Sequence, residues 1–179
     1  FGKKVLITGH TGFKGFWLAM ILRSMGANVV GVSLKTDPNK KSHFNSLNGE
    51  DLIKTFFLDI KDLHSLKELT NQIKPDYIFH LAAQALVAES FKDPINTFTT
   101  NTIGSINLLE SMRDANYKSN LIMITSDKVY ENVEWVFGYR ENDKLGGSDP
   151  YSASKACAEL SIRSYFKSYL RNSNIRLCI

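Results

Sequence analysis

The 179-residue sequence predicts a single α/β domain, residues 1–179, built on a doubly wound parallel sheet with strand order 3-2-1-4-5-6. Strand-like and helix-like segments alternate along the whole chain, which is the pattern of a parallel sheet with helices on both faces. A glycine-rich turn directly follows the first strand-like segment. Hydrophobic residues make up 43% of the chain, enough to bury a core of ordinary size.

The first third of the chain predicts three strands, one helix and one loop. Residues 4–8 (KVLIT) are β-branched and apolar and predict the first strand, whereas apolar side chains at helical spacing in residues 13–25 predict a helix. Residues 28–33 (NVVGVS) predict the second strand. Residues 34–51 are polar, with a proline, a glycine and several asparagines, and predict a loop. Residues 53–59 (IKTFFLD) predict the third strand.

The middle of the chain continues this alternation. Residues 62–73 predict a helix, and residues 76–82 (DYIFHLA) predict the fourth strand. Residues 94–115 predict a long helix because apolar side chains recur along them at helical spacing. Residues 120–125 (NLIMIT) predict the fifth strand, which a sheet of this type places beside the fourth.

The last third predicts one loop, one helix and the final strand. Residues 126–149 are rich in glycine and aspartate and predict a loop, and residues 151–171 predict a helix. Residues 174–179 (NIRLCI) predict the sixth strand. The chain starts without a methionine and stops on this apolar run, so we expect an N-terminal part of a longer protein.

Three glycines at strict spacing lie between the first strand and the first helix. In TGHTGFKG, Gly9 occupies the tight turn, Gly12 the place where a pyrophosphate passes the main chain, and Gly15 the contact between helix and strand. The free amides at the start of the helix, near Phe13, face an anion with the helix dipole behind them. This pattern predicts a Rossmann-type dinucleotide site.

The end of the second strand leaves the choice between NAD and NADP open. Many NAD sites place an acidic residue there for the adenosine ribose, but this chain has Ser33, Leu34 and Lys35. Lys35 favours a 2′-phosphate, and Asp37 comes late for a ribose diol. At the end of the third strand, Asp59 is placed to reach an adenine amino group, although an ordinary loop aspartate explains it too.

A second group of candidate residues consists of Tyr151 and Lys155, four residues apart at the start of a helix. This spacing puts both side chains on one helix face. An ammonium beside a phenol stabilises the phenolate and lowers its pKa from about 10 toward neutrality. Such a pair can take a proton from an alcohol while a hydride leaves for nicotinamide. The spacing alone is also common on helix surfaces, so the interpretation depends on the glycine turn.

Three polar residues follow the fifth strand at its carboxyl end, where ligands bind in open α/β sheets. Ser126, Asp127 and Lys128 supply a hydroxyl, a carboxyl group and an amine. Alcohol oxidation does not need all of these groups, which indicates a further proton transfer. A polar turn leaving a strand is the alternative interpretation.

These motifs together resemble the extended short-chain dehydrogenases/reductases. The resemblance is carried by TGHTGFKG, HLAAQALV, TNTIGSINLLE, ITSDKVYEN and GYRENDKLGGSDPYSASKACAEL, and it covers nearly the whole chain. Within the family, Ser126, Asp127 and Lys128 resemble the CDP-glucose 4,6-dehydratases, whereas the related dTDP-glucose enzymes have Thr-Asp-Glu there. The chain departs from such enzymes at Ala85 and Ala88, where they usually carry proline and arginine.

The resemblance implies an internal redox cycle that converts CDP-glucose to CDP-4-keto-6-deoxy-glucose and water with recycled NAD+. Tyr151, assisted by Lys155 and held with Ser126, takes the proton of the sugar C4 hydroxyl. Lys128 takes the C5 proton, and Asp127 protonates the departing C6 hydroxyl. The implied cofactor residues are Gly9, Thr11, Gly12, Phe13, Gly15, Asp59, Ile60, Leu81, Ala82, Ala83, Asn101, Thr125, Tyr151 and Lys155, and the implied substrate residues are Gln84, Leu86 and Ser126.

Composition argues against several other classes of function. The net charge is +4, but the lysines are scattered among acidic residues, which disfavours nucleic-acid binding. The four histidines share no ligand spacing, so no metal site is expected. No apolar run is long enough to cross a membrane. Cys157 and Cys178 lie in apolar or helical patterns and are expected to be buried thiols of a cytoplasmic protein.

Two alternatives remain open at this point. The first is another nucleotide-sugar dehydratase or an epimerase of the same family, and the second is a catalytically silent nucleotide-binding regulator. By analogy with the family, we also expect a homodimer formed through helices 94–115 and 151–171.

Overall fold

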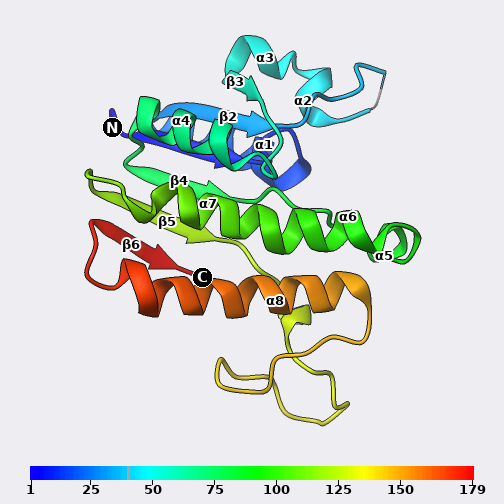
Figure 1. Cartoon of the computed structure of the whole chain (residues 1–179). Coiled ribbons are helices and arrows are strands. Elements are labelled where there is room, and N and C mark those ends of the chain that lie inside the picture. Colours follow the sequence, from blue (N-terminus) through cyan, green and yellow to red (C-terminus); the bar gives the residue numbers. More distant parts are fainter. Residues whose placement is uncertain (40) are drawn as a thin grey trace.

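The structure, a computed structural model, describes residues 1–39 and 41–179 and confirms the predicted sheet. Six strands pair in the order β3-β2-β1-β4-β5-β6, and every neighbouring pair is parallel (Figure 1). The strands are β1 (Lys4–Thr8), β2 (Asn28–Ser33), β3 (Lys54–Phe57), β4 (Tyr77–His80), β5 (Ser119–Met123) and β6 (Ile175–Cys178). The order changes direction between β1 and β4, which is where a doubly wound sheet opens a crevice for ligands.

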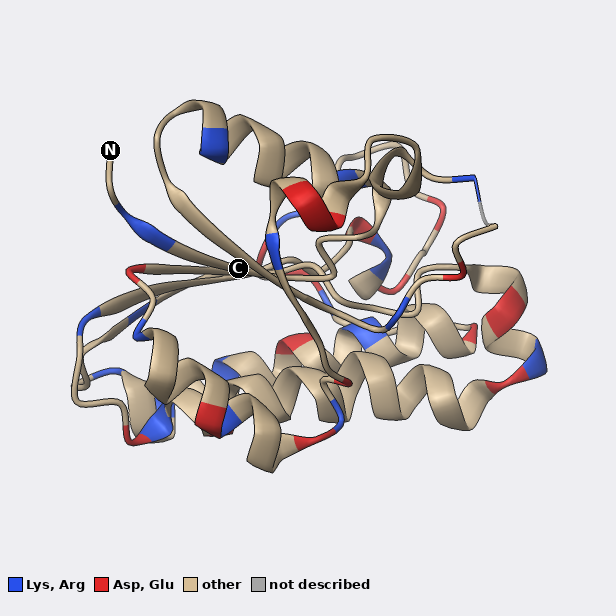
Figure 2. Ribbon diagram, turned by 90° about the horizontal axis from the view of Figure 1, so that it is seen from above, with Lys and Arg blue, Asp and Glu red and all other residues tan. Residues whose placement is uncertain are grey.

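Helices cover both faces of the sheet, as Figures 1 and 2 show. One face carries α4 (Leu63–Ile73), α7 (Gly104–Arg113) and α8 (Pro150–Tyr165), and the other carries α1 (Phe13–Ser24). Aspartates begin two of these helices: Asp62 accepts the amide of Ser65 at α4, and Asp149 accepts that of Ser152 at α8.

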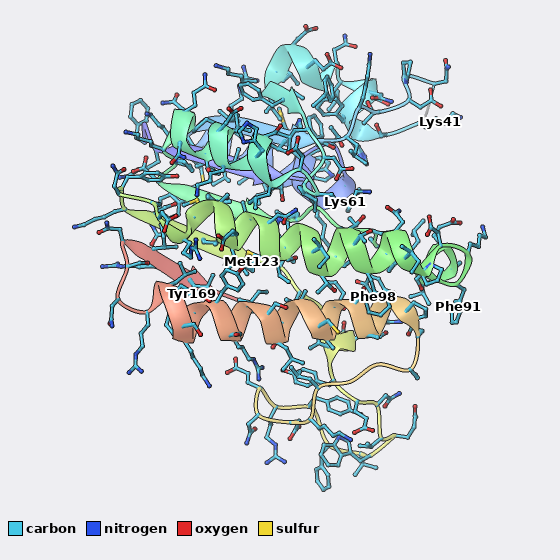
Figure 3. All side chains as sticks on the ribbon, in the orientation of Figure 1. Lys41, Lys61, Phe91, Phe98, Met123 and Tyr169 are labelled. Atoms are coloured by element: carbon cyan, nitrogen blue, oxygen red, sulfur yellow. The ribbon has the colours of Figure 1, made fainter. Side chains whose placement is uncertain are left out.

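Two hydrophobic clusters, one on each face, hold the layers together. The larger cluster contains Leu6 of β1, Leu121 and Met123 of β5, and Leu108 of α7, and Met123 is labelled in Figure 3. The smaller cluster packs Ile7 of β1 against residues of α1. Because β1, in the middle of the sheet, is buried on both sides from Val5 to Thr8, its sequence is a nearly continuous apolar run rather than an alternating one.

Several predicted segments are more structured than expected. The predicted loop 34–51 contains two short helices, α2 (His43–Ser46) and α3 (Gly49–Leu52). Phe44 of α2 is buried among apolar residues of α1, which anchors this short helix to the domain. Residue 40 lies outside the described residues. A further helix, α5 (Val87–Lys92), precedes the predicted helix 94–115, and α2, α3 and α5 were all missed.

Both long predicted helices contain a π-helical segment. Helix 94–115 consists of α6 (Pro94–Phe98), the π-helical turn η1 (Thr99–Ile103) and α7. Helix 151–171 starts one residue earlier than predicted, as α8, and ends in the π-helical turn η3 (Phe166–Leu170). The predicted loop 126–149 begins with a short 3₁₀ turn, η2 (Asp127–Val129), and its ends are joined by a β-bridge between Tyr130 and Leu145.

The prediction that both cysteines are buried was wrong. Cys157 and Cys178 are free thiols, and both are exposed. Cys157 is an exposed residue of α8 beside the buried Ala156, and Cys178 is near the end of β6, the last strand of the sheet formed by the described residues. An apolar sequence neighbourhood therefore did not indicate which face each thiol occupies.

Charged residues of both signs are interspersed over the helices and loops, as Figure 2 shows. Among the residues that the structure describes, no helix is both long enough and apolar enough to span a membrane.

Candidate functional site

A cleft of about 600 Å³ opens at the carboxyl ends of β1, β2, β4 and β5. This is the position at which open parallel sheets bind their ligands. The cleft walls include the predicted cofactor residues Gly9, Thr11, Gly12, Phe13, Gly15, Asp59, Ile60, Leu81, Ala82, Ala83, Thr125, Tyr151 and Lys155. Residues from five separate stretches of the chain therefore meet around one cavity, and Asn101 is the one predicted cofactor residue that does not line it.

The glycine turn has the backbone geometry that its spacing predicts. Gly9 has a φ of +75°, and a Cβ there would lie 2.7 Å from the backbone nitrogen of Ala82. A Cβ on Gly15 would collide with the carbonyl oxygen of Gly9 and lie 2.8 Å from the Cα of His10. Both positions need glycine because two backbone segments of the chain are in direct contact there, which leaves no space for a Cβ.

Gly12 differs from the other two glycines because it faces the cleft. A Cβ there would meet only the Gly9 carbonyl oxygen, at 3.3 Å. Gly12 is the N-cap of α1, and among the described residues no side chain caps this helix start. The first amides of α1 are thus left for an anion from the cleft, with the helix dipole behind them.

Tyr151 and Lys155 project from the first turns of α8 into the same cleft. Tyr151 is half-buried, whereas Lys155 is only 6% exposed. The Nζ of Lys155 donates a hydrogen bond of 2.9 Å to the carbonyl oxygen of Ile124, just after β5. The predicted pair is therefore brought together with the strand end that carries Thr125.

Burial lowers the pKa of Lys155 from 10.5 to about 8, and the charge of Glu159 one turn later opposes this shift. Glu159 is itself buried and accepts a 2.7 Å ion pair from Arg163. The positive charge of Lys155 in turn contributes, after burial, to lowering the pKa of His80 to about 3. His80 is therefore neutral at physiological pH, and Lys155 is a buried cation in the cleft lining.

We expect the Lys155 ammonium to titrate near pH 8 in the folded protein, well below the surface lysines. NMR of lysine labelled with ¹³C at Cε measures this directly, and the Lys155→Met variant identifies the signal. A value near 10.5 would contradict the prediction.

Between pH 8 and 10.5 the unfolded chain binds more protons at Lys155 than the folded protein does. The contribution of Lys155 to the free energy of unfolding therefore rises with pH across that window, relative to Lys155→Met.

Asn101 lies beneath the cleft wall rather than in it. It is 1% exposed, in the π-helical turn η1, where such turns often mark functional positions. Its Oδ1 accepts the backbone N–H of Gln84 at 2.8 Å, and its Nδ2 donates to the Gln84 carbonyl at 3.0 Å and to the Ser154 hydroxyl at 2.9 Å. Ser154 donates to the carbonyl of Tyr151. Asn101 therefore joins the segment after β4 to the start of α8.

Replacing Asn101 with alanine is expected to lower the free energy of unfolding by roughly 2–4 kcal/mol, because it leaves buried polar groups of Gln84 and Ser154 unpaired. Thermal unfolding followed by circular dichroism measures the change. The matched control is Asn116→Ala, at an exposed asparagine, which should change stability by no more than about 0.5 kcal/mol. Equal effects of the two substitutions would remove the assigned role.

Buried polar residues beneath the cleft were not predicted as part of the site. Thr8 of β1 shares a 2.7 Å hydrogen bond with the Nδ1 of His80, whose Nε2 is 3.1 Å from the hydroxyl of Ser105. Thr8 also accepts the backbone N–H of Ala82 at 3.2 Å. The signal for these residues was present in the sequence, because each interrupts an otherwise apolar strand or helix face.

The predicted substrate residues Gln84 and Leu86 lie at the rim. Gln84 lines the cleft, but its side-chain amide bonds both backbone groups of Leu86, which is itself 63% exposed and outside the lining. The Gln84 side chain therefore fixes the backbone of the loop after β4 at Leu86, and Leu86 itself is not part of the cleft lining.

None of the residues Ser126, Asp127 and Lys128 lines this cleft. Ser126 and Asp127 line a second cleft, of about 620 Å³, and Lys128 lines neither cleft. Asp127 and Lys128 are exposed, and Ser126 uses its hydroxyl to accept the backbone N–H of Lys128. The two clefts meet at Thr125, which lines both.

The second cleft lies between the end of β5, α8 and β6. Glu159 and Arg163 of α8 reach it, and Arg163 also donates to the carbonyl of Glu141, which joins α8 to the 126–149 segment. Four of the five predicted catalytic residues therefore divide between two adjoining cavities, and Lys128 lines neither. Tyr151 and Lys155 lie on one side of Thr125, and Ser126 and Asp127 lie on the other.

One end of the first cleft is formed by the residues that follow β2 and β3. Asp59 accepts the backbone N–H of Lys61 at 2.9 Å and forms an ion pair of 3.4 Å with its ammonium, and Lys61 is labelled in Figure 3. Ile60 is buried beside Asp59. Ser33 and Leu34 line the cleft, whereas Lys35 and Asp37 do not.

Comparison with known proteins places this architecture among sugar-nucleotide enzymes. The family model described as GDP-mannose 4,6 dehydratase matches residues 6–178. The chain is 44% identical to CDP-glucose 4,6-dehydratase of Salmonella typhimurium over 173 residues, which is 97% of this chain and 48% of that protein. It is also 30% identical to GDP-mannose 4,6-dehydratase of Yersinia enterocolitica, over 93% of this chain and 46% of that protein.

A solved structure supports the same assignment. UDP-glucose 4-epimerase of Thermus thermophilus, in complex with NAD, superposes with a TM-score of 0.77 at 28% identity, over 93% of this chain and 51% of that chain. The chain spans about half the length of the curated relatives it matches. With the glycine turn, the Tyr151 and Lys155 pair and the matching residues 6–178, the chain belongs to the GDP-mannose 4,6-dehydratase family of extended short-chain dehydrogenases/reductases, as its motifs predicted.

Proposed function

We propose that the chain is the dinucleotide-binding part of an NAD-dependent lyase, a CDP-glucose 4,6-dehydratase that forms CDP-4-keto-6-deoxy-glucose and water. The observation that carries this proposal is the 44% identity to the Salmonella typhimurium enzyme over nearly the whole chain. The Ser126, Asp127 and Lys128 triplet, which the sequence motifs link to the CDP-glucose enzymes, supports it.

The residues around the first cleft fit a dinucleotide such as NAD. Gly12 leaves room beside the main chain, and the uncapped start of α1 offers amides to a pyrophosphate. Lys155 and Tyr151 lie at the opposite part of the cleft, next to Thr125. The chemistry that a bound nicotinamide supplies there is reversible hydride transfer with a sugar carbon.

Tyr151 and Lys155 act in the oxidation half of the reaction. Tyr151 takes the proton from the sugar C4 hydroxyl, and the Lys155 ammonium stabilises the phenolate. Ser126, which is half-buried just after β5, forms a hydrogen bond to the same sugar hydroxyl through its side-chain hydroxyl. The reacting sugar lies where the two clefts meet, at Thr125, because only there can both groups of residues reach it.

Asp127 and Lys128 act in the elimination half. Lys128, when neutral, takes the C5 proton, and Asp127, when protonated, donates a proton to the departing C6 hydroxyl. Ser126 and Asp127 are held together by a 3.2 Å hydrogen bond, so both remain at one edge of the second cleft. The positive charge of Lys128 also acts on Asp149, the N-cap of α8, which carries Tyr151.

The direct test uses the full-length protein with CDP-glucose and NAD+. We expect a 4-keto sugar, detected by its absorbance in alkali. Product from dTDP-glucose or GDP-mannose but not from CDP-glucose would contradict the choice of nucleotide and favour another dehydratase of the family. A nucleotide-sugar product that keeps all its hydroxyl groups but has the opposite configuration at C4 would indicate an epimerase. UDP-glucose 4-epimerases are among the relatives of this chain.

Replacing Asp127 with asparagine is expected to lower 4-keto-6-deoxy product formation by about 10²-fold or more, because the amide cannot donate the required proton efficiently. Oxidation of the sugar at C4 should continue, so reduced cofactor accumulates and is visible as absorbance. Asp143→Asn, in the 126–149 segment, is the control. Unchanged product formation in Asp127→Asn would assign the acid to another residue.

We also propose that the protein is a cytoplasmic homodimer formed through residues 94–115 and 151–171. Ile95, Ile103 and Leu160 on these helices are exposed apolar residues, and two exposed free thiols fit a reducing compartment. Sedimentation velocity of the purified protein gives its assembly state.

The alternative function is a catalytically silent regulator. A full-length protein that binds dinucleotide but has no activity toward any nucleotide sugar would favour it.

A further inference from the structure

The end of β2 has an unusual composition for a site that binds an adenosine ribose. Sites selective for NAD usually place a carboxylate there, because it accepts hydrogen bonds from the ribose diol and repels a 2′-phosphate. Here Ser33 ends β2, and its hydroxyl forms a 2.6 Å hydrogen bond with the hydroxyl of Thr11 from the glycine turn. Both residues line the cleft.

No free carboxylate compensates for the missing acid among the cleft residues that the structure describes. The single acidic residue in the lining is Asp59, and both of its oxygens are engaged by Lys61, one with the backbone N–H and the other with the ammonium. The lining also contains Lys14, in the first turn of α1. The charges around the cleft therefore do not disfavour an additional phosphate.

A hydroxyl pair differs chemically from a carboxylate at this position. Each hydroxyl has one donor hydrogen and accepting lone pairs, whereas an ionised carboxylate only accepts. Either Thr11 or Ser33 can be the donor in their mutual hydrogen bond, so the pair can present a donor or an acceptor to the cleft. It can accept a bond from a ribose hydroxyl or donate one to a phosphate oxygen.

We propose that Thr11 and Ser33 are the specificity-determining residues for the adenosine ribose, and that they admit both NAD(H) and NADP(H). This inference rests on the proposed dinucleotide binding and extends it to the ribose that carries the adenine. The two dinucleotides bind this protein with dissociation constants that differ by no more than about tenfold.

Titration of the purified protein with NADH and with NADPH, followed by cofactor fluorescence at one fixed salt concentration, tests the proposal without any turnover. Ser33→Asp is expected to weaken NADPH at least about hundredfold relative to NADH, because it restores the repelling carboxylate. Ser33→Ala keeps the position neutral, so both dinucleotides should weaken together and their ratio should stay near the wild-type value. Ser164→Asp, at an exposed serine on α8 outside the cleft, makes the same charge change as a control and should alter neither affinity.

Two outcomes would overturn the proposal on its own. One is wild-type protein whose dissociation constants for NADH and NADPH differ by more than about tenfold, and the other is folded Ser33→Asp with an unchanged ratio. Circular dichroism establishes that each variant is folded. If neither dinucleotide binds the wild-type protein, the proposed function fails as well, so the two failures are distinguishable.

Discussion

Tyr151→Phe is expected to lower turnover by about 10²- to 10⁴-fold, because it removes the one group assigned to take the proton from the sugar hydroxyl. The affinity for dinucleotide should stay within about twofold, since the aromatic ring keeps its place on the wall of the cleft. Steady-state kinetics with the full-length protein gives the first value, and cofactor fluorescence gives the second. A joint loss of turnover and binding would indicate a structural effect of the substitution.

The same helix offers a matched control for this substitution. Tyr165 is also on α8, but its hydroxyl donates a hydrogen bond to Glu110 of α7, and it does not line the first cleft. Tyr165→Phe removes an equal atom from the same element, so turnover should change little while stability falls slightly. Tyr151→Phe with turnover within threefold of wild type would exclude Tyr151 as the base.

Gly15→Ala is expected to unfold the glycine turn and abolish dinucleotide binding. The new Cβ would collide with the carbonyl oxygen of Gly9 and lie 2.8 Å from the Cα of His10, and neither backbone atom can move without shifting the turn. Overpacking of this kind costs about 1–3 kcal/mol or more. Thermal unfolding should therefore move down by roughly 3–10 °C in a domain of this size.

Alanine substitutions at two other glycines, Gly12 and Gly138, serve as controls for Gly15→Ala. A Cβ on Gly12 meets only the Gly9 carbonyl oxygen, at 3.3 Å, so Gly12→Ala should remain folded and lose dinucleotide affinity because the methyl group enters the cleft. A Cβ on Gly138 meets nothing within 4 Å, so Gly138→Ala should change neither stability nor binding. Equal melting temperatures for Gly15→Ala and Gly138→Ala would refute the proposed crowding.

The parts of the fold that were predictable depend on local patterns. The strands β1 and β2 match the predicted ranges because their apolar, β-branched runs are bounded by clear turn signals. The glycine turn was also predictable, because its three positions each obey a steric rule. By contrast, α2 is held by the burial of Phe44 in a tertiary contact, which no local pattern in the polar segment 34–51 reveals.

The candidate site was predictable in its composition but not in its layout. The sequence motifs identified Tyr151 and Lys155, and the structure brings both into one cleft. They did not indicate that Ser126 and Asp127 border a second cavity, or that Asn101 lies beneath the cleft wall. Those placements depend on how the segment after β5 turns and on the widened helical turn at η1, which are properties of the packed chain.

The π-helical turn η1 has a mechanical consequence for the helix that contains it. The residues after it, in α7, pack into the core with Leu108, Leu109 and Met112, whereas the residues before it extend past the sheet with exposed Ile95. One added residue per turn rotates the later stripe of side chains relative to the earlier one. In a regular α-helix the side chains of α6 and α7 would keep one phase, whereas the wider turn at η1 changes that phase within one continuous helix.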